Sequence, residues 1–135
     1  MNKILIDTMH IAGLLTNESG AYFELAKAIK NQKITGVVSV VTLTELIKIL
    51  GEENMDKIND LVYTKLVFIN ITQKIAMRAG DIRLKYDIPT IDSLIAATGL
   101  VENIKHILTH DTRHFEATKN LIKPVDLKTV LKMAK

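Results

Sequence analysis

Four acidic side chains, spread from residue 7 to residue 111, are of the types that hold metal ions in enzymes. They are Asp7, Glu45, Asp92 and Asp111. Carboxylates that converge without a counter-ion repel one another, so a site that contains all four needs a divalent cation. The sequence has no cysteine and no histidines at a clear ligand spacing, and hard oxygen ligands favour Mg²⁺ or Mn²⁺ over zinc. If the four side chains meet in the fold, they form a magnesium or manganese site.

Each of the four acids also has a simpler structural explanation. Asp7 and Asp111 could each cap the helix that follows. Glu45 ends the segment TLTE, residues 42–45, which matches the Ser/Thr-x-x-Glu capping box. Asp92 lies in the first turn of a predicted helix, where the helix dipole favours a negative charge. A single acid is therefore no sign of a metal site, and the hypothesis depends on all four meeting.

The surrounding sequence predicts the elements that position these acids. Apolar segments of strand length alternate with segments of helical periodicity. Strands are predicted at 3–7, 36–41, 66–70 and 106–109, and helices at 21–30, 43–50, 55–63, 72–86, 90–101 and 125–133. A short turn or helix is expected through Phe115, and the last helix could follow a short fifth strand. This alternation predicts an α/β fold with three layers, α/β/α, and a mainly parallel sheet of four to five strands.

The predicted elements place all four acids at one edge of the sheet. Asp7 and Asp111 lie at or just after the ends of predicted strands. Glu45 and Asp92 lie near the beginnings of predicted helices. In parallel α/β sheets, strand ends and the beginnings of the following helices face the same side of the molecule, where active sites lie. The acids are therefore expected to share one cleft.

Composition limits the class of protein. A chain of 135 residues that is 47% hydrophobic is expected to form one domain over residues 1–135. No apolar segment approaches the ~18 residues that cross a bilayer, and Asp7 interrupts the only candidate signal sequence, so we expect a cytoplasmic protein without membrane contact. The net charge is +3, but removing four of the 15 acids leaves 11 against 18 basic residues, an excess of +7. That excess suits a polyanionic substrate, although the charge alone is better explained by ordinary solvated lysines.

The order of the motifs resembles that of PIN-domain ribonucleases, and it is most similar to the VapC-type toxins of toxin–antitoxin pairs. The resemblance runs from Asp7 to Phe115 and rests on Asp7-Thr8, on TLTE at 42–45, on IPTIDSLIAAT at 88–98 and on ILTHDTRHF at 107–115. It implies the strand order 3-2-1-4-5. Met9 departs from the pattern, because many members have a small polar residue at that position.

The resemblance also implies a site and a function. The acids Asp7, Glu45, Asp92 and Asp111 would hold one or two Mg²⁺ or Mn²⁺ ions, with the hydroxyls of Thr8 and Thr109 in support. The activity would be metal-dependent hydrolysis of RNA phosphodiester bonds by an endoribonuclease. A homodimer and a cognate antitoxin are the implied protein partners. The alternatives are a PIN-domain nuclease of RNA maturation or decay, or a catalytically idle PIN scaffold that binds RNA or protein.

Two further side chains are candidate substrate contacts, and the sequence argues against two rival protein classes and a zinc site. Arg113 and His110 lie close to the last acid in sequence and are candidates for substrate binding. A phosphoacceptor domain of the receiver type would need an aspartate after the third strand, where this chain has Asn70, and a DxD phosphatase would need a second aspartate at Met9. His106, His110 and His114 recur every four residues, but a strand separates the first two, so no zinc site is expected.

Overall fold

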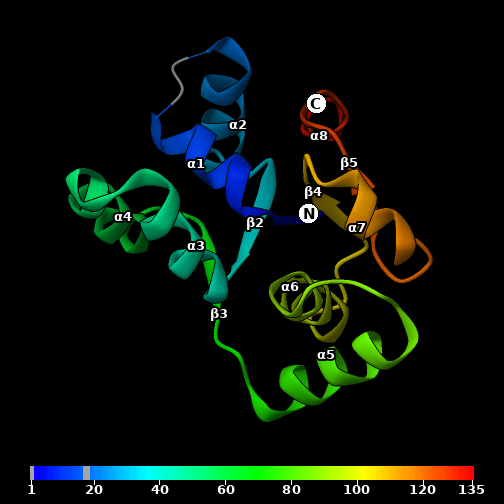
Figure 1. Ribbon diagram of the computed structural model, residues 1–135. Helices are drawn as coiled ribbons and strands as arrows, with labels where there is room; N and C mark the ends of the chain where they lie inside the picture. The colour runs from blue at the N-terminus through cyan, green and yellow to red at the C-terminus, as the bar shows by residue number, and fades with distance from the viewer. Residues whose placement is uncertain (1, 17–18) are drawn as a thin grey trace.

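Five parallel strands form one sheet in the computed structural model, which describes residues 2–16 and 19–135. The strands are β1 (Asn2–Ile6), β2 (Ile34–Ser39), β3 (Val67–Ile69), β4 (His106–Leu108) and β5 (Lys123–Val125). Their order in the sheet is β3-β2-β1-β4-β5, and every neighbouring pair is parallel (Figure 1). This confirms both the predicted fold class and the predicted strand order.

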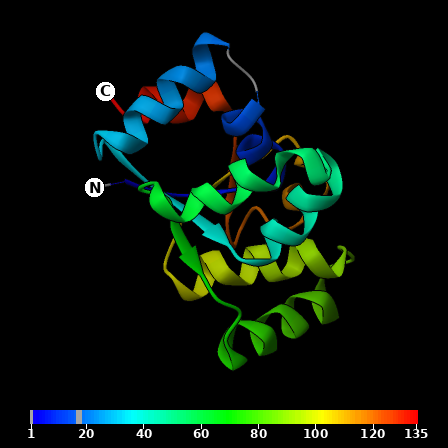
Figure 2. The same ribbon diagram turned by 90° about the vertical axis from the view of Figure 1, so that its left-hand side faces the viewer.

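Helices cover both faces of the sheet. They are α1 (Thr8–Thr16), α2 (Gly20–Lys30), α3 (Val41–Leu50), α4 (Met55–Asn59), α5 (Gln73–Lys85), α6 (Thr90–Val101), α7 (Thr112–Ala117) and α8 (Leu127–Met133), with the 3₁₀ turns η1 (Glu52–Asn54) and η2 (Asp60–Tyr63) beside α4. Helices α1, α2, α3, α4 and α8 contribute to the apolar cluster on one face of the sheet. Helices α5, α6 and α7 contribute to the cluster on the other face, and Figure 2 shows α5 and α6 as a separate layer.

The central strand β1 is exposed at Asn2 and Lys3, but its last three residues, 4–6, are apolar and buried on both faces of the sheet. Ile4 and Ile6 belong to one cluster and Leu5 to the other, because successive side chains of a strand point to opposite faces. In the neighbouring strand, a Cβ on Gly36 would lie 2.8 Å from Leu66 Cδ2 and 2.9 Å from Ile6 Cδ1. Only glycine fits between these two side chains without displacing them.

Four segments differ from the sequence-based predictions. The strand predicted at 36–41 is β2 and lies two residues earlier, at Ile34–Ser39, because Val41 already belongs to α3. No helix was predicted at 8–16, where the structure has α1. Five of its first six residues are buried, so the segment lacks the polar face that produces a helical pattern in the sequence. The helix predicted from Val125 begins two residues later, since Val125 belongs to β5 and Asp126 Oδ1 caps α8 by accepting from Thr129 N at 2.8 Å. The predicted helix at 55–63 consists of α4 and η2.

Among the residues that the structure describes, none of the helices combines the length and the apolar character needed to cross a bilayer.

Candidate metal centre

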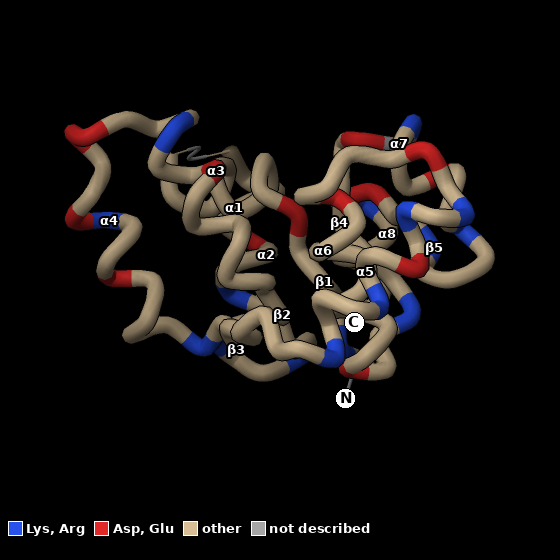
Figure 3. The backbone as a smooth tube through the Cα atoms, turned by 60° about the horizontal axis from the view of Figure 1, so that its bottom comes forward, with Lys and Arg blue, Asp and Glu red and all other residues tan. Residues whose placement is uncertain are grey.

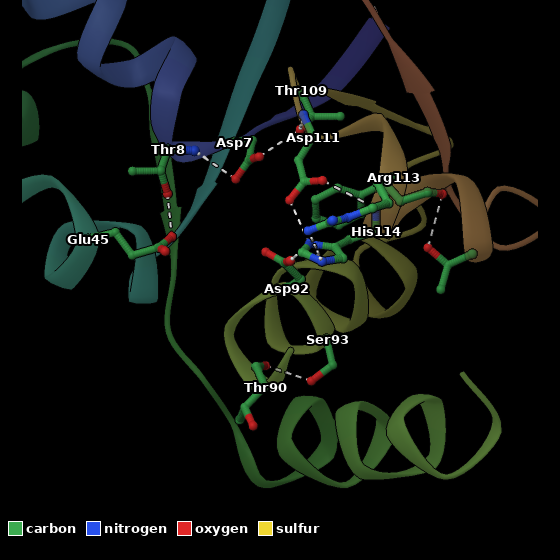
Figure 4. A network of polar contacts seen from close by, with 12 residues as sticks. Asp7, Thr8, Glu45, Thr90, Asp92, Ser93, Thr109, Asp111, Arg113 and His114 are labelled. Atoms are coloured by element: carbon green, nitrogen blue, oxygen red, sulfur yellow. Dashed lines mark hydrogen bonds and ion pairs between the residues drawn. The ribbon is translucent and has the colours of Figure 1, made fainter. Parts of the chain in front are cut away.

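The pairing of β1 with β4 brings two of the predicted acids to the same edge of the sheet. Asp7 directly follows β1, and its backbone N–H donates to the carbonyl of Leu108 at 3.0 Å, which continues the ladder beyond the last paired residues. Asp111 comes three residues after Leu108, the end of β4. Glu45 projects from α3 and Asp92 from the first turn of α6, and Figure 4 shows both carboxylates facing this edge.

Asp7 is a buried carboxylate with a hydrogen bond to each oxygen. Its Oδ2 accepts from Thr109 Oγ1 at 2.7 Å, and its Oδ1 accepts from Thr8 N at 2.8 Å. Burial raises the pKa of Asp7; these two hydrogen bonds oppose the shift, while the charges of Glu45 and Asp111 add to it. Asp7 is therefore a carboxylate that the fold fixes in place although burial and neighbouring charges disfavour its ionised form.

The two threonines implied as supporting residues connect the acids to one another. Thr109 Oγ1 donates to Asp7 and accepts from the backbone N–H of Asp111 at 2.9 Å, so one hydroxyl joins the two strand ends. Thr8 Oγ1 donates to Glu45 Oε1 at 2.6 Å, which joins α1 to α3. Both threonines are buried.

Of the simpler structural explanations for the acids, the one for Glu45 is wrong, and those for Asp111 and Asp92 agree with the structure. The capping-box alternative for Glu45 is wrong, because α3 begins at Val41 after Val40, with Thr42 inside the helix and without a side-chain cap. Asp111 does cap its helix: its Oδ1 accepts from His114 N at 3.2 Å. Asp92 lies in the first turn of its helix, as predicted.

A histidine joins the remaining two acids. His114 Nδ1 lies 2.7 Å from Asp92 Oδ2 and 2.7 Å from Asp111 Oδ2 (Figure 4). Burial, followed by the charges of Asp7 and Asp111, raises the pKa of Asp92 to about 6, and His114 opposes the shift. In the part of the chain that the structure describes, Asp92, Asp111 and His114 form the group whose ligand atoms all lie within 4.8 Å of one another. Asp7 and Glu45 lie outside this tight group; the charge of Asp7 acts on Asp92, and the charge of Glu45 acts on Asp7.

The residues at this edge fit a divalent cation. Four carboxylates supply hard oxygen donors, and the imidazole of His114 lies against two of them. The pKa values of Asp7 and Asp92 are raised by burial and by the charges of neighbouring acids. A cation between the acids would remove that repulsion.

His114 is the residue that sequence reasoning missed. Its position three residues after Asp111 at a helix start, where side chains at i and i+3 are neighbours, was the available signal. His110, predicted as a substrate contact, instead stacks on His10 with ring centroids 4.0 Å apart. His10 is buried and its Nδ1 lies 3.0 Å from Tyr22 Oη. Arg113 is exposed, and its Nη2 lies 3.4 Å from His114 Nε2.

The raised pKa of Asp92 predicts how the stability of the metal-free protein depends on pH. Asp92, with a pKa of about 6 against an ordinary 3.8, destabilises the fold as pH rises from about 4 to 6. Burial, and after it the charge of His110, lowers the pKa of His10 from 6.5 to about 4. His10 therefore has the opposite effect: the stability of the fold is lost as pH falls from 6.5 to about 4. We expect Asp92→Asn to remove only the first effect. Urea unfolding should then show stability rising more steeply with pH in the variant than in the wild type between pH 4 and 6.5.

The control is Asp87→Asn, on the exposed connection between α5 and α6. It should keep the wild-type pH profile. An Asp92→Asn profile parallel to that of the wild type would show that Asp92 is not held in a repulsive environment.

Comparison with known proteins agrees with this geometry. The sequence profile of the PIN domain matches residues 4–121. A comparison with curated protein sequences gives no match.

Solved structures show the same fold. A chain of DNA-bound VapBC from Salmonella typhimurium is 20% identical, with a TM-score of 0.76 over 94% of this chain and 99% of that one. A chain of VapBC2 from Rickettsia felis, bound to a promoter DNA fragment, is 17% identical, with a TM-score of 0.75 over 92% and 98%. VapC20 from Mycobacterium tuberculosis, a toxin that cleaves the sarcin–ricin loop, is 14% identical, with a TM-score of 0.68 over 84% and 94%. With its acids at the edge that this fold provides and a profile match over most of its length, the chain belongs to the PIN domain family.

Proposed function

We propose that this protein is a metal-dependent endoribonuclease that hydrolyses RNA phosphodiester bonds, and that it is the toxin of a VapBC-type toxin–antitoxin pair. The observation that carries the proposal is the meeting of four carboxylates, Asp7, Glu45, Asp92 and Asp111, at one edge of a PIN fold. An idle PIN scaffold, or a PIN nuclease of RNA maturation or decay, is the alternative. A complete set of four acids favours an enzyme over the scaffold.

The four acids would hold one or two Mg²⁺ or Mn²⁺ ions. A bound ion supplies two kinds of chemistry: it activates a water molecule and stabilises negative charge on the phosphate and the leaving oxygen. The chain itself contributes the fixed positions of the ligands. Thr109 holds Asp7 and Asp111 in register, and Thr8 holds Glu45 toward Asp7. This preorganisation keeps repelling carboxylates in place before an ion arrives.

The proposed substrate is RNA, and the proposed location is the cytoplasm. Figure 3 shows several lysine and arginine positions around β5 and around α7, the helix that Asp111 caps. Arg113, Lys119 and Lys123 there are exposed. A guanidinium next to the carboxylates can bind a phosphate without reading a base, so Arg113 remains the proposed substrate contact. His110, the other predicted substrate contact, is the weaker candidate because its ring stacks on His10.

An apolar groove suits an antitoxin segment. A cavity of about 390 Å³ lies between α1, α2 and the segment through η2. Its lining is mostly apolar, with two lysines at the margin: Leu14, Leu15, Ala26, Ile29, Leu61, Tyr63, Leu66, Lys30 and Lys65, together with Thr64. An amphipathic partner segment with apolar and acidic side chains would complement it. The similarity to chains of VapBC complexes supports the same partner.

Cleavage should depend on metal and on Glu45. We expect the purified protein to cleave single-stranded RNA with Mg²⁺ or Mn²⁺ and to stop when EDTA is added. Glu45→Gln should lower the rate at least about tenfold, a barrier increase of ~1.4 kcal/mol, because the charge that binds metal is lost. Its melting temperature should change little, since the glutamine oxygen can still accept from Thr8.

Glu52→Gln, on an exposed 3₁₀ turn, is the matched control and should cleave like the wild type. Cleavage that survives EDTA in protein free of other nucleases would contradict the mechanism. Wild-type cleavage by Glu45→Gln would remove Glu45 from the site.

A second expectation concerns the homodimer. Met77 and Leu84 lie seven positions apart on α5, hence on one face, and are 68% and 84% exposed. Burying such side chains favours association, so light scattering at high micromolar concentration should give twice the 15.1 kDa of one chain. Leu84→Glu should dissociate the dimer. Tyr63→Glu, at a residue 86% exposed beside the apolar groove, should leave the dimer intact. A monomer in the wild type would contradict the dimer but not the nuclease.

A further inference from the structure

We propose that His114 is a positioning residue of the metal centre: its ring N–H holds the carboxylates of Asp92 and Asp111 together at the spacing in which they receive the ion. This inference rests on the proposed function, because it concerns the ion that function requires. It assigns a role to a side chain outside the set of four acids.

The first support is that one ring atom contacts both carboxylates. Asp92 belongs to α6 and Asp111 to the N-cap of α7, so no backbone hydrogen bond fixes one carboxylate relative to the other. His114 Nδ1 lies 2.7 Å from an oxygen of each, the distance of a strong hydrogen bond to a charged acceptor. Without this bridge, two half-buried negative groups would move apart.

The second support is the proton position on the ring. Arg113 Nη2 lies 3.4 Å from His114 Nε2, and a guanidinium only donates hydrogen bonds. An ionised carboxylate only accepts hydrogen bonds, so the 2.7 Å contacts of Nδ1 with both acids call for the ring proton on Nδ1, and the approach of Arg113 to Nε2 agrees with this tautomer. In this tautomer His114 donates to the acids and does not offer them a lone pair.

The third support is that the bridge leaves oxygen lone pairs for a metal. An ionised carboxylate has about four lone-pair positions. His114 uses one on Asp92, through Nδ1, and two on Asp111, through Nδ1 and its own backbone N–H. An ion can therefore bind both carboxylates while the ring remains in contact with them.

The helix that carries the ring is anchored by apolar packing. The next residue, Phe115, is fully buried in the apolar cluster of α5 and α6, and this anchors α7. His114 itself is 23% exposed, so its ring is packed on most sides. A ring on an anchored helix can set the spacing of the two carboxylates, and hydrogen-bond partners of metal ligands contribute about 10- to 100-fold to metal affinity.

The test measures Mn²⁺ affinity of the full chain without RNA, by electron paramagnetic resonance of free Mn²⁺. We expect His114→Ala to bind Mn²⁺ about 10- to 100-fold more weakly than the wild type. His114→Asn should recover most of the affinity, since its amide nitrogen can occupy the place of Nδ1 and donate. His106→Ala, at the start of β4 and hence at the opposite edge of the sheet, should bind like the wild type.

Circular dichroism checks that each variant is folded. Wild-type or tighter Mn²⁺ binding by His114→Ala would overturn the inference, because the ring would then be idle or would compete with the ion. Mn²⁺ binding by His114→Asn that is as weak as binding by His114→Ala would also overturn it, because a donor at the place of Nδ1 would then not restore the site. If the wild type binds no Mn²⁺, the proposed function fails, and this inference fails with it.

Discussion

The pairing of β1 with β4 is the constraint on which the site depends. Two parallel strands that are adjacent in the sheet but about one hundred residues apart in sequence end side by side, and an acid follows each. The hydroxyl of Thr109 then links Asp7 to the backbone of Asp111. Since Asp7 is only 8% exposed, its carboxylate has little freedom to move into solvent. Repulsion among the acids is thus built into the fold.

Two apolar clusters make that repulsion tolerable. Side chains of β1 alternate between them, so the strand that carries Asp7 is held from both faces. Helices α3, α6 and α7 each bring one side chain to the site from elements that are anchored by buried residues such as Leu46, Ile95 and Phe115. A stable scaffold that supports an unfavourable cluster of charges is typical of functional sites. The unfavourable electrostatics is what a cation would relieve.

Much of this arrangement could be predicted from the sequence. The buried strand before Asp7 and the helix at 90–101 have clear apolar patterns, and the parallel topology follows from their alternation. Helix α1 could not be found by periodicity, because it is buried on most sides. The capping box predicted at 42–45 is wrong because the helix already begins at Val41, with Val40 at its N-cap. His114 was missed because its contact with Asp92 is tertiary, and no local pattern encodes the approach of α6 to α7.

The central claim, that the fold holds Asp7 for a metal ion and not for its own stability, is tested most directly by Asp7→Asn. The measurement is the melting temperature of wild type and variant, each with and without Mn²⁺. The account predicts that the variant without metal melts at the same or a higher temperature, because repulsion is relieved, and that Mn²⁺ stabilises it less than the wild type. A variant that melts lower in both conditions and gains as much from Mn²⁺ as the wild type would contradict it, and would make Asp7 a structural cap.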